Sequence, residues 1–220
     1  REFFTVQANS GQAIGFDGLG PHLVTGPLYH AAPMMYALFD MANGAPLIIM
    51  PRFDAELALQ LMASRAVRHT HWVPTMFNRA LAFRASYPDG FPALDFVLHG
   101  AAPITDKLKR EMIDWWGPKL DEYWGGTESG IVTLARALEW VQRPGTVGKP
   151  IGPYLVYAVD ETGQHLASGE QGLLCIEHKQ LDQPFYYHQA QQKTADTYIA
   201  RRRFTIGDIG KVDDAGYVYL

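Results

Sequence analysis

The sequence predicts an α/β fold, a mostly parallel sheet with flanking helices, followed by a β-rich, barrel-like subdomain. Short apolar runs recur at nearly equal spacing in the first part of the chain, and segments with helix start signals lie between them. Beyond residue 140 this pattern gives way to glycines, turn residues and β-branched or aromatic alternation. The change predicts an α/β subdomain at residues 1–142 and a β-rich subdomain at 143–220.

The apolar runs of the first part are expected to be strands of successive β-α units. They are His22–Thr25, Pro46–Met50, Thr70–Val73, Phe96–His99 and Leu120–Trp124. Ligands of open α/β sheets bind beyond the carboxyl ends of the strands. The loops that follow these runs are therefore where functional residues are expected.

Helix start and stop signals lie between the apolar runs. Asp54 and Thr105 are side chains of the kind that cap helix N-termini, and Pro74 suits the first turn of a helix. Gly117 is followed by a proline, which is a typical stop signal. We expect the apolar stripes of these helices to face the core.

The β-rich part has its own pattern of short segments. The expected elements are strands at 154–159, 172–177 and 217–220, a turn at 160–164 and a short helix at 189–196. Cys175 is the single cysteine, so an internal disulfide is excluded, and its apolar neighbours predict a packed core thiol. Arg201–Arg203 is expected to be a solvated turn.

Composition indicates a globular protein, because 47% of the 220 residues are hydrophobic. The net charge of −4 argues against a nucleic-acid partner. No apolar run approaches the ~20 residues that span a bilayer, so we expect a cytoplasmic protein without a transmembrane segment. The first residue is not methionine and the last residues are β-prone, from which we expect a fragment of a longer polypeptide.

Residues 122–130 combine an aromatic pair, Tyr123 and Trp124, with glycines, a hydroxyl and a carboxylate. The glycines permit close backbone approach or positive φ, and the rings offer a flat surface for a base. A hydroxyl beside a carboxylate, here Thr127 and Glu128, suits a phosphate bound to Mg²⁺. These residue types predict a nucleotide and metal site.

This stretch resembles the Tyr-Gly-x-Thr-Glu signature of the adenylate-forming superfamily, which includes the acyl-CoA synthetases. Other segments, in the same order, are similar to segments of the acyl-CoA synthetase branch. They are Pro27–His30, Val73–Met76, Gly100–Pro103, Gly145–Pro150 and Phe204–Gly210. Together they are far more specific than any one of them.

The resemblance implies how a nucleotide, ATP or AMP, would bind. Adenine would lie between an aromatic residue and a turn of small residues, and the ribose hydroxyls would donate to an ionised acceptor. The residues concerned are Tyr123, Trp124, Gly125, Gly100, Ala101, Ala102 and, for the ribose, Asp208. Trp124 replaces the usual tyrosine, so the two rings share or exchange the adenine role, and a buried strand end is the alternative interpretation for both. Ile206 stands where the family commonly has threonine.

The resemblance also implies the catalytic and substrate-binding residues. Thr127 would contact the α-phosphate, Glu128 would bind Mg²⁺, and His30 would gate the entry of the carboxylate substrate. Trp72, Met76 and Gly126 would line the substrate pocket. Structural hydrogen bonding is the alternative for His30, and core packing explains Trp72 and Met76 nearly as well.

The implied activity is that of an acyl-CoA synthetase, which activates a fatty or other apolar acid as acyl-AMP and transfers it to CoA. A serine-, threonine- and glycine-rich phosphate loop is not found before His30, so the resemblance covers only the middle of such an enzyme, and we expect these 220 residues alone to be inactive. One alternative is an adenylation domain that loads an amino or aryl acid onto a carrier protein. Another is a non-catalytic nucleotide-binding module.

Overall fold

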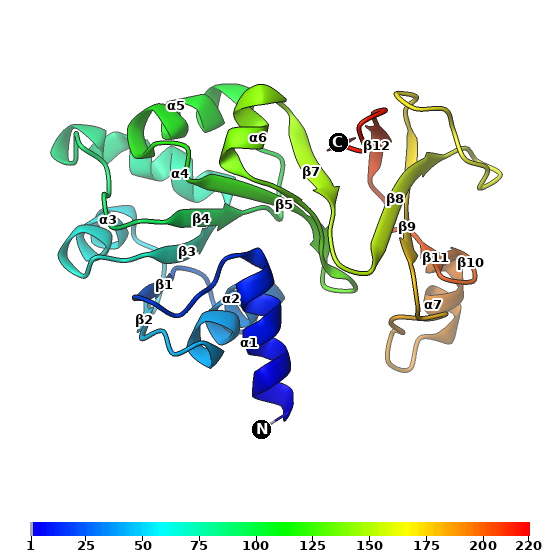
Figure 1. Ribbon diagram of the computed structural model, residues 1–220, viewed down its shortest axis with the longest axis horizontal. Helices are drawn as coiled ribbons and strands as arrows, with labels where there is room; N and C mark the ends of the chain where they lie inside the picture. Colours follow the sequence, from blue (N-terminus) through cyan, green and yellow to red (C-terminus); the bar gives the residue numbers. More distant parts are fainter. Residues whose placement is uncertain (1) are drawn as a thin grey trace. The chain divides into compact units, whose positions relative to one another are not determined.

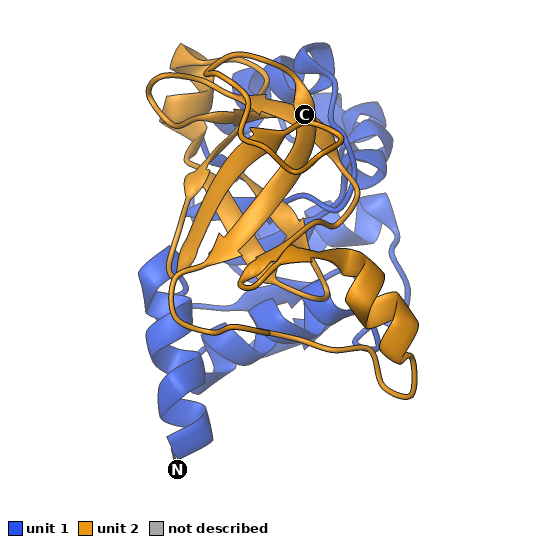
Figure 2. Ribbon diagram, turned by 90° about the vertical axis from the view of Figure 1, so that its right-hand side faces the viewer, with its two compact units in different colours: residues 1–121 blue, residues 122–220 orange. Residues whose placement is uncertain are grey.

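The computed structural model describes residues 2–220 (Figure 1). It divides into two compact units, residues 1–121 and 122–220 (Figure 2). This division differs from the boundary after residue 142 that the composition predicts. In the second unit a continuous antiparallel ladder extends across residue 142, so packing and composition change at different points of the chain.

The first unit contains the predicted parallel sheet. Its strands are β1 (His22–Val24), β2 (Leu47–Ile49), β3 (His69–Trp72) and β4 (Phe96–His99). Their order is β2-β1-β3-β4, and all three pairs are parallel. The strand and parallel-sheet predictions for this part are therefore confirmed.

Helices flank this sheet on both faces. They are α1 (Glu2–Ile14), α2 (Ala31–Ala42), α3 (Ala55–Ser64), α4 (Pro74–Ala80) and α5 (Asp106–Trp116), with a 3₁₀ helix, η1 (Leu81–Ser86), after α4. In Figure 1, α1 and α2 lie below the strands, and α4 and α5 lie above them.

The predicted helix signals act as expected. The side chain of Asp54 accepts a hydrogen bond from the backbone N–H of the third residue after it, and Thr105 does the same. Pro74 lies in the first turn of α4. Gly117 ends α5 with φ of 83°, a conformation that glycine adopts without steric cost.

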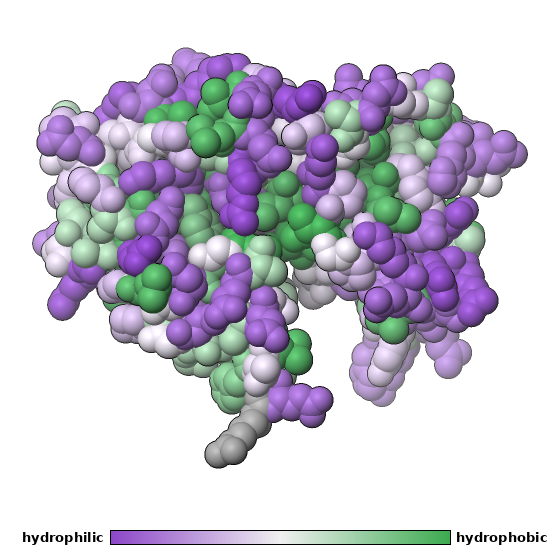
Figure 3. Space-filling model, viewed as in Figure 1, coloured by the Kyte–Doolittle hydropathy of each residue, from purple (hydrophilic) through white to green (hydrophobic). Residues whose placement is uncertain are grey.

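Helix α1 has no counterpart among the predicted elements, because its Asn-Ser-Gly segment is poor in helix propensity. Packing explains the glycine: a Cβ at Gly11 would lie only 2.8 Å from Cβ of Phe39 on α2. Phe3, Phe4 and Val6 of α1 are more than half exposed. Figure 3 shows both apolar and hydrophilic surface in the region of this helix.

The core of the first unit lies between the sheet and helices α3 to α5. Trp72 is fully buried there, with its ring stacked on Phe77 and edge-on to Trp116. Such aromatic pairs contribute about 0.5–1.5 kcal/mol each beyond the area they bury. This cluster holds the strand ends in place.

The second unit is an antiparallel β structure with two short helices. Its strands are β5 (Leu120–Gly126, which begins in the first unit), β6 (Gly130–Ala135), β7 (Thr146–Pro150), β8 (Tyr154–Val159), β9 (Gly172–His178), β10 (Tyr198–Ala200), β11 (Arg203–Phe204), β12 (Ile209–Val212) and β13 (Val218–Tyr219). The helices are α6 (Ala137–Gln142) and α7 (Gln191–Thr197). From β10 the order is β10-β11-β9-β12-β13-β7-β6-β5, with β8 also paired to β9.

The predicted elements of this part are largely confirmed. Strands β8 and β9 occupy the predicted ranges, and α7 begins two residues later than the predicted helix. Asp160 closes the turn between β8 and β9, because its Oδ1 accepts from two backbone N–H groups. Cys175 is buried, as predicted. Arg201 and Arg202 lie in the predicted turn, and both pair with Asp182, whereas Arg203 is half-buried in β11 and pairs with Glu177.

Among residues 2–220, no helix is both long and apolar enough to cross a membrane.

Candidate functional site

Three of the predicted segments meet at one edge of the sheet in the first unit. Strands β1, β3 and β4 are adjacent and parallel, so their carboxyl ends lie at the same edge. Residues 25–30 follow β1, residues 73–76 follow β3 and residues 100–103 follow β4. This edge is where α/β sheets bind ligands.

His30 occupies the N-cap position of α2, with an extended backbone of φ −86° and ψ 142°. Its side chain makes no capping hydrogen bond and is exposed, and its ring lies 4.6 Å from the ring of Tyr29. The imidazole is thus presented at the sheet edge. The gating role stays a prediction.

The predicted pocket residues at the end of β3 and in α4 are more buried than His30. Trp72 is buried in the core, and its indole N–H donates to Oγ1 of Thr70 at 3.1 Å. Met76 is half-buried, with Sδ 3.6 Å from Oγ1 of Thr25. Core packing therefore accounts for Trp72, as one interpretation of the sequence had it, and a pocket role for either residue stays a prediction.

The turn after β4 carries an unusual backbone conformation. Gly100 is buried, whereas Ala101 and Ala102 are exposed. Ala101 has φ of 64°, in the left-handed region that costs a residue with a Cβ roughly 1–2 kcal/mol. Strain of this kind is concentrated at functional sites. The small side chains leave the peptide planes of the turn uncovered, which suits the predicted adenine contact.

In the second unit, the hairpin of β5 and β6 carries Thr127 and Glu128 at its tip. The backbone N–H of Ser129 donates to the carbonyl of Gly126 at 3.3 Å, and the Ser129 hydroxyl accepts from the Gly126 N–H at 3.2 Å. These bonds close a tight turn. Thr127 is exposed and Glu128 is half-buried, so a hydroxyl and a carboxylate stand side by side on a fixed support.

Gly125 lies at a β-bulge in this hairpin, where the register between β5 and β6 shifts. A Cβ at this position would lie 1.9 Å from the carbonyl oxygen of Gly130. Only glycine allows the two strands to approach so closely. The bulge is therefore a structural reason for Gly125, whether or not a nucleotide also contacts it.

Trp124 and Asp208, which are 84 residues apart in the sequence, meet in the second unit. The indole N–H donates to Oδ2 of Asp208 at 2.7 Å. Trp124 is 5% exposed and packs in a core cluster with Val132 and Phe204, so its position is fixed by packing. Tyr123 is also buried. Both rings thus fit the buried strand end of the alternative interpretation, and their adenine roles stay predictions.

Glu128 and the Asp208 segment lie near a common point, Gly126. A Cβ at Gly126 would lie 3.0 Å from Oε2 of Glu128 and 3.7 Å from Cδ1 of Ile206, two residues before Asp208. The backbone of Gly207 has φ of 93° and donates to Oγ1 of Thr205. The Glu128 carboxylate and the segment that carries Asp208 therefore belong to neighbouring loops of one unit, and their metal and ribose roles stay predictions.

Tyr187 was not identified from the sequence, yet its hydroxyl donates to Oε1 of Glu128 at 2.7 Å. This hydrogen bond is the main reason why the pKa of Tyr187 is raised above its ordinary value. The phenol therefore keeps its proton and remains a donor at neutral pH. A tyrosine 59 residues from its partner carries no local sequence signal for such a contact.

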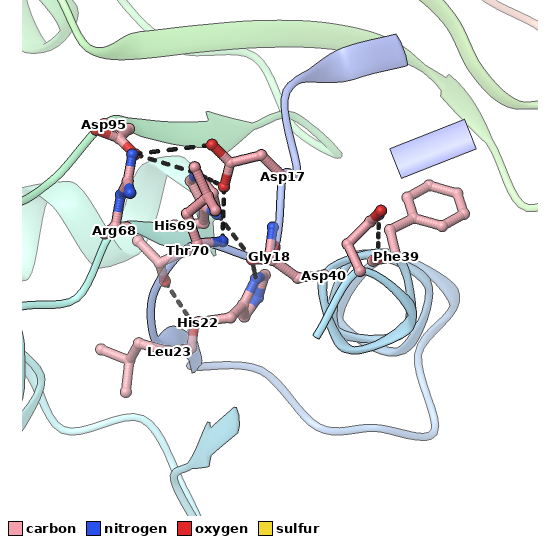
Figure 4. A network of polar contacts seen from close by, with 12 residues as sticks. Asp17, Gly18, His22, Leu23, Phe39, Asp40, Arg68, His69, Thr70 and Asp95 are labelled. Carbon is pink, nitrogen blue, oxygen red and sulfur yellow. Dashed lines mark hydrogen bonds and ion pairs between the residues drawn. The ribbon is translucent and has the colours of Figure 1, made fainter. Parts of the chain in front are cut away.

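A buried polar network ties α2 to the sheet of the first unit (Figure 4). Nδ1 of His22 and Nδ1 of His69 lie 3.0 and 2.8 Å from Oδ2 of Asp40, and Gly18 N–H donates to Oδ1. Burial opposes ionisation of Asp40, but hydrogen bonds from the two histidines outweigh it and lower its pKa to about 2. Burial lowers the pKa of His22. The network anchors the helix that begins beside His30.

Part of this network has the composition of a metal site. Among the described residues, Asp17, Asp40 and His69 each offer one ligand atom, and these atoms lie within 4.8 Å of one another. However, both oxygens of Asp40 already accept hydrogen bonds, and Arg68 pairs with Asp17 and Asp95. The cluster is satisfied as a structural network.

Comparison with known proteins bears out the resemblance. Residues 7–186 match the family described as AMP-binding enzyme. Mitochondrial acyl-coenzyme A synthetase ACSM4 of Mus musculus is 31% identical over 175 residues, which cover 78% of this chain and 30% of the relative. The 2-succinylbenzoate–CoA ligase of Bacillus licheniformis is 27% identical over 210 residues, which cover 92% of this chain and 42% of the relative. The chain thus spans less than half of these relatives.

Solved structures have the same fold. O-succinylbenzoate coenzyme A synthetase of Bacillus subtilis, in complex with AMP, gives a TM-score of 0.83 at 20% identity and covers 98% of this chain and 44% of that one. Amide bond synthetase McbA of Marinactinospora thermotolerans gives 0.87 at 18% identity, covering 99% of this chain and 44% of that one. Because the family match extends over residues 7–186, which is well over half of this chain, the chain belongs to the AMP-binding enzyme family.

Proposed function

We propose that this chain is part of an ATP-dependent ligase that activates an apolar carboxylic acid as acyl-AMP and transfers the acyl group to CoA. The observation that carries the proposal is in the second unit: Trp124 donates to Asp208, and Glu128 and Ile206, two residues before Asp208, both lie beside Gly126. A base-binding ring, a metal-binding carboxylate and a ribose acceptor are the groups that an adenylate requires.

Each of these residues has a task in the proposed reaction. Asp208 accepts hydrogen bonds from the ribose hydroxyls, a task for an acceptor-only carboxylate. Thr127 contacts the α-phosphate. By the family resemblance, His30 is assigned to the acyl entrance and the turn at 100–102 to adenine contact. Positioning and charge neutralisation of this kind lower the barrier of phosphate-centred transfers.

The oxygen donors of the β5–β6 turn fit Mg²⁺, which prefers carboxylate and phosphate oxygens and retains several waters. Glu128 would hold the ion through Oε2, beside the hydroxyl of Thr127. When bound, Mg²⁺ would neutralise phosphate charge. Glu128 is half-buried, so part of its side chain is exposed to solvent.

The acyl substrate is proposed to be a fatty or other apolar acid. This class is supported by Met76 and by the apolar residues of α2 that follow His30. Among the relatives, ACSM4 is named an acyl-coenzyme A synthetase, whereas the Bacillus licheniformis relative is named for 2-succinylbenzoate, which carries an aromatic ring. An aryl acid is therefore the second candidate class.

Pyrophosphate release tests the proposal. The natural polypeptide that contains this chain is incubated with Mg·ATP, CoA and a panel of aliphatic, aryl and amino acids. We expect release with an apolar acid, and a loss of at least about tenfold in Asp208→Ala, because a charge-assisted hydrogen bond contributes about 1.5–3 kcal/mol. Full activity of Asp208→Ala would contradict the assigned site.

The same assay separates the alternatives. Acyl transfer to a carrier-protein thiol in place of CoA would indicate an adenylation domain, and ATP binding without pyrophosphate release would indicate a non-catalytic module. Residues 1–220 alone are proposed to be inactive. Acyl-AMP formation by this piece would contradict that proposal.

A further inference from the structure

The hydrogen bond between Tyr187 and Glu128 joins two parts of the second unit that the sequence keeps far apart. The phenol donates to Oε1 of Glu128 at 2.7 Å. The other carboxylate oxygen, Oε2, lies beside Gly126, where an added Cβ would be 3.0 Å from it. One oxygen of this carboxylate is thus held by the protein, and the other is directed at the backbone of the turn.

Tyr187 is itself held firmly in place by α7 and the residues before it. Its backbone N–H donates to Oγ1 of Thr194 at 2.9 Å, and Thr194 is buried and also bonded to Ala190. The Lys193 ammonium lies 3.9 Å from the centre of the Tyr187 ring, and the Phe185 ring lies edge-on at 5.6 Å. The hydroxyl is therefore presented from a rigid support.

We propose that Tyr187 is a positioning residue that occupies Oε1 of Glu128, so that the carboxylate binds a divalent cation through Oε2 alone and thereby favours Mg²⁺ over Ca²⁺. This inference rests on the proposed function, because it takes the cation to be the one that accompanies ATP. It assigns a role to Tyr187 and a preference for Mg²⁺ over Ca²⁺, neither of which follows from the sequence motifs.

The coordination preferences of the two cations supply the physical reason. Mg²⁺ is small, requires near-octahedral geometry and is held by few carboxylate oxygens, whereas Ca²⁺ accepts bidentate carboxylates in flexible geometry. A carboxylate with one oxygen already engaged is a poor bidentate ligand. Partners that orient a ligand in this way typically change metal affinity by about 10- to 100-fold, and the partly exposed site here reduces that to about 3- to 10-fold.

The test measures cation binding directly, in the polypeptide that contains this chain. Mn²⁺ binding in the presence of ATP is followed by electron paramagnetic resonance, and Mg²⁺ and Ca²⁺ are titrated as competitors. The variants are Tyr187→Phe, Glu128→Gln and their combination, with Tyr186→Phe as the matched control, since the Tyr186 side chain is 74% exposed. Thermal unfolding confirms that each variant folds.

We expect Tyr187→Phe to weaken Mg²⁺ binding by about 3- to 10-fold and Ca²⁺ binding by less, so that the Mg²⁺/Ca²⁺ preference falls. Tyr186→Phe should leave both affinities unchanged. In the Glu128→Gln background the tyrosine substitution should add less than about a factor of two, because its partner is already altered. A purely structural role of Tyr187 would lower the unfolding temperature and leave the preference unchanged.

An unchanged cation preference in Tyr187→Phe, or an equal loss with and without Glu128, would overturn the inference. Cation affinity that does not depend on Glu128 would overturn it as well, together with the assigned metal ligand. Failure of the proposed ligase activity is separate, because it would appear as absent pyrophosphate release while the cation titrations still report on Tyr187.

Discussion

The hydrogen bond from Trp124 to Asp208 is open to a quantitative test by a double-mutant cycle of Trp124→Phe and Asp208→Ala. Trp124→Phe removes the indole N–H and also leaves space in a packed core, where Val132 and Phe204 lose contacts. The cycle separates the two effects, since the packing loss is common to both backgrounds.

The coupling energy follows from the geometry of the bond. At 2.7 Å, with an ionised acceptor, it belongs to the stronger class of hydrogen bonds, which contribute about 1.5–3 kcal/mol. Asp208 is only half-buried, so water competes for the carboxylate. We therefore expect a coupling of about 1–1.5 kcal/mol, at or just below the lower limit of that range.

Urea unfolding of the four proteins, followed by circular dichroism, measures this coupling. ATP affinity measured in the same set tests the link to the proposed function, because an Asp208 carboxylate that has lost its partner is held less firmly for the proposed ribose contact. Additive effects within about 0.3–0.5 kcal/mol would mean that the bond does not exist in solution. That result would refute the pairing on which the proposed nucleotide site depends.

Three further predictions concern the backbone conformation and the dependence of stability on pH. Ala101→Gly should raise the free energy of unfolding by about 1 kcal/mol in urea titrations, because it relieves a left-handed φ; no gain would argue against this turn geometry. Gly125→Ala should destabilise the protein by more than about 3 kcal/mol through the clash at the bulge, whereas Gly152→Ala, with a positive φ but open space, should cost about 1 kcal/mol; equal costs would contradict the bulge. Burial lowers the pKa of His22, and lowers that of His71 to about 3. The unfolded chain therefore binds protons that the folded chain does not. As the pH falls below 6.5, the free energy of unfolding should decrease by up to about 1.4 kcal/mol per pH unit for each histidine. Urea midpoints measured between pH 7 and 4 will show this decrease. Unchanged midpoints over that range would contradict the burial of these rings.

Much of the fold was predictable because its signals are local. Strand runs such as Phe96–His99, caps such as Asp54 and stop residues such as Gly117 depend on a few neighbouring residues. The order of short motifs was also sufficient to indicate the AMP-binding enzyme family, since each motif is contiguous. Helix α1 escaped prediction because a glycine that packing requires lowers its local propensity.

Tertiary structure alone decided the contacts that build the candidate site. Trp124 meets Asp208 and Tyr187 meets Glu128 across 84 and 59 residues, and no local sequence signal specifies which side chains meet across such long separations. The left-handed backbone of Ala101 is likewise set by its surroundings, since an alanine does not favour it. Composition and motifs thus determined the fold class and the family. Long-range packing decided which oxygen of the Glu128 and Asp208 carboxylates accepts a hydrogen bond within the chain.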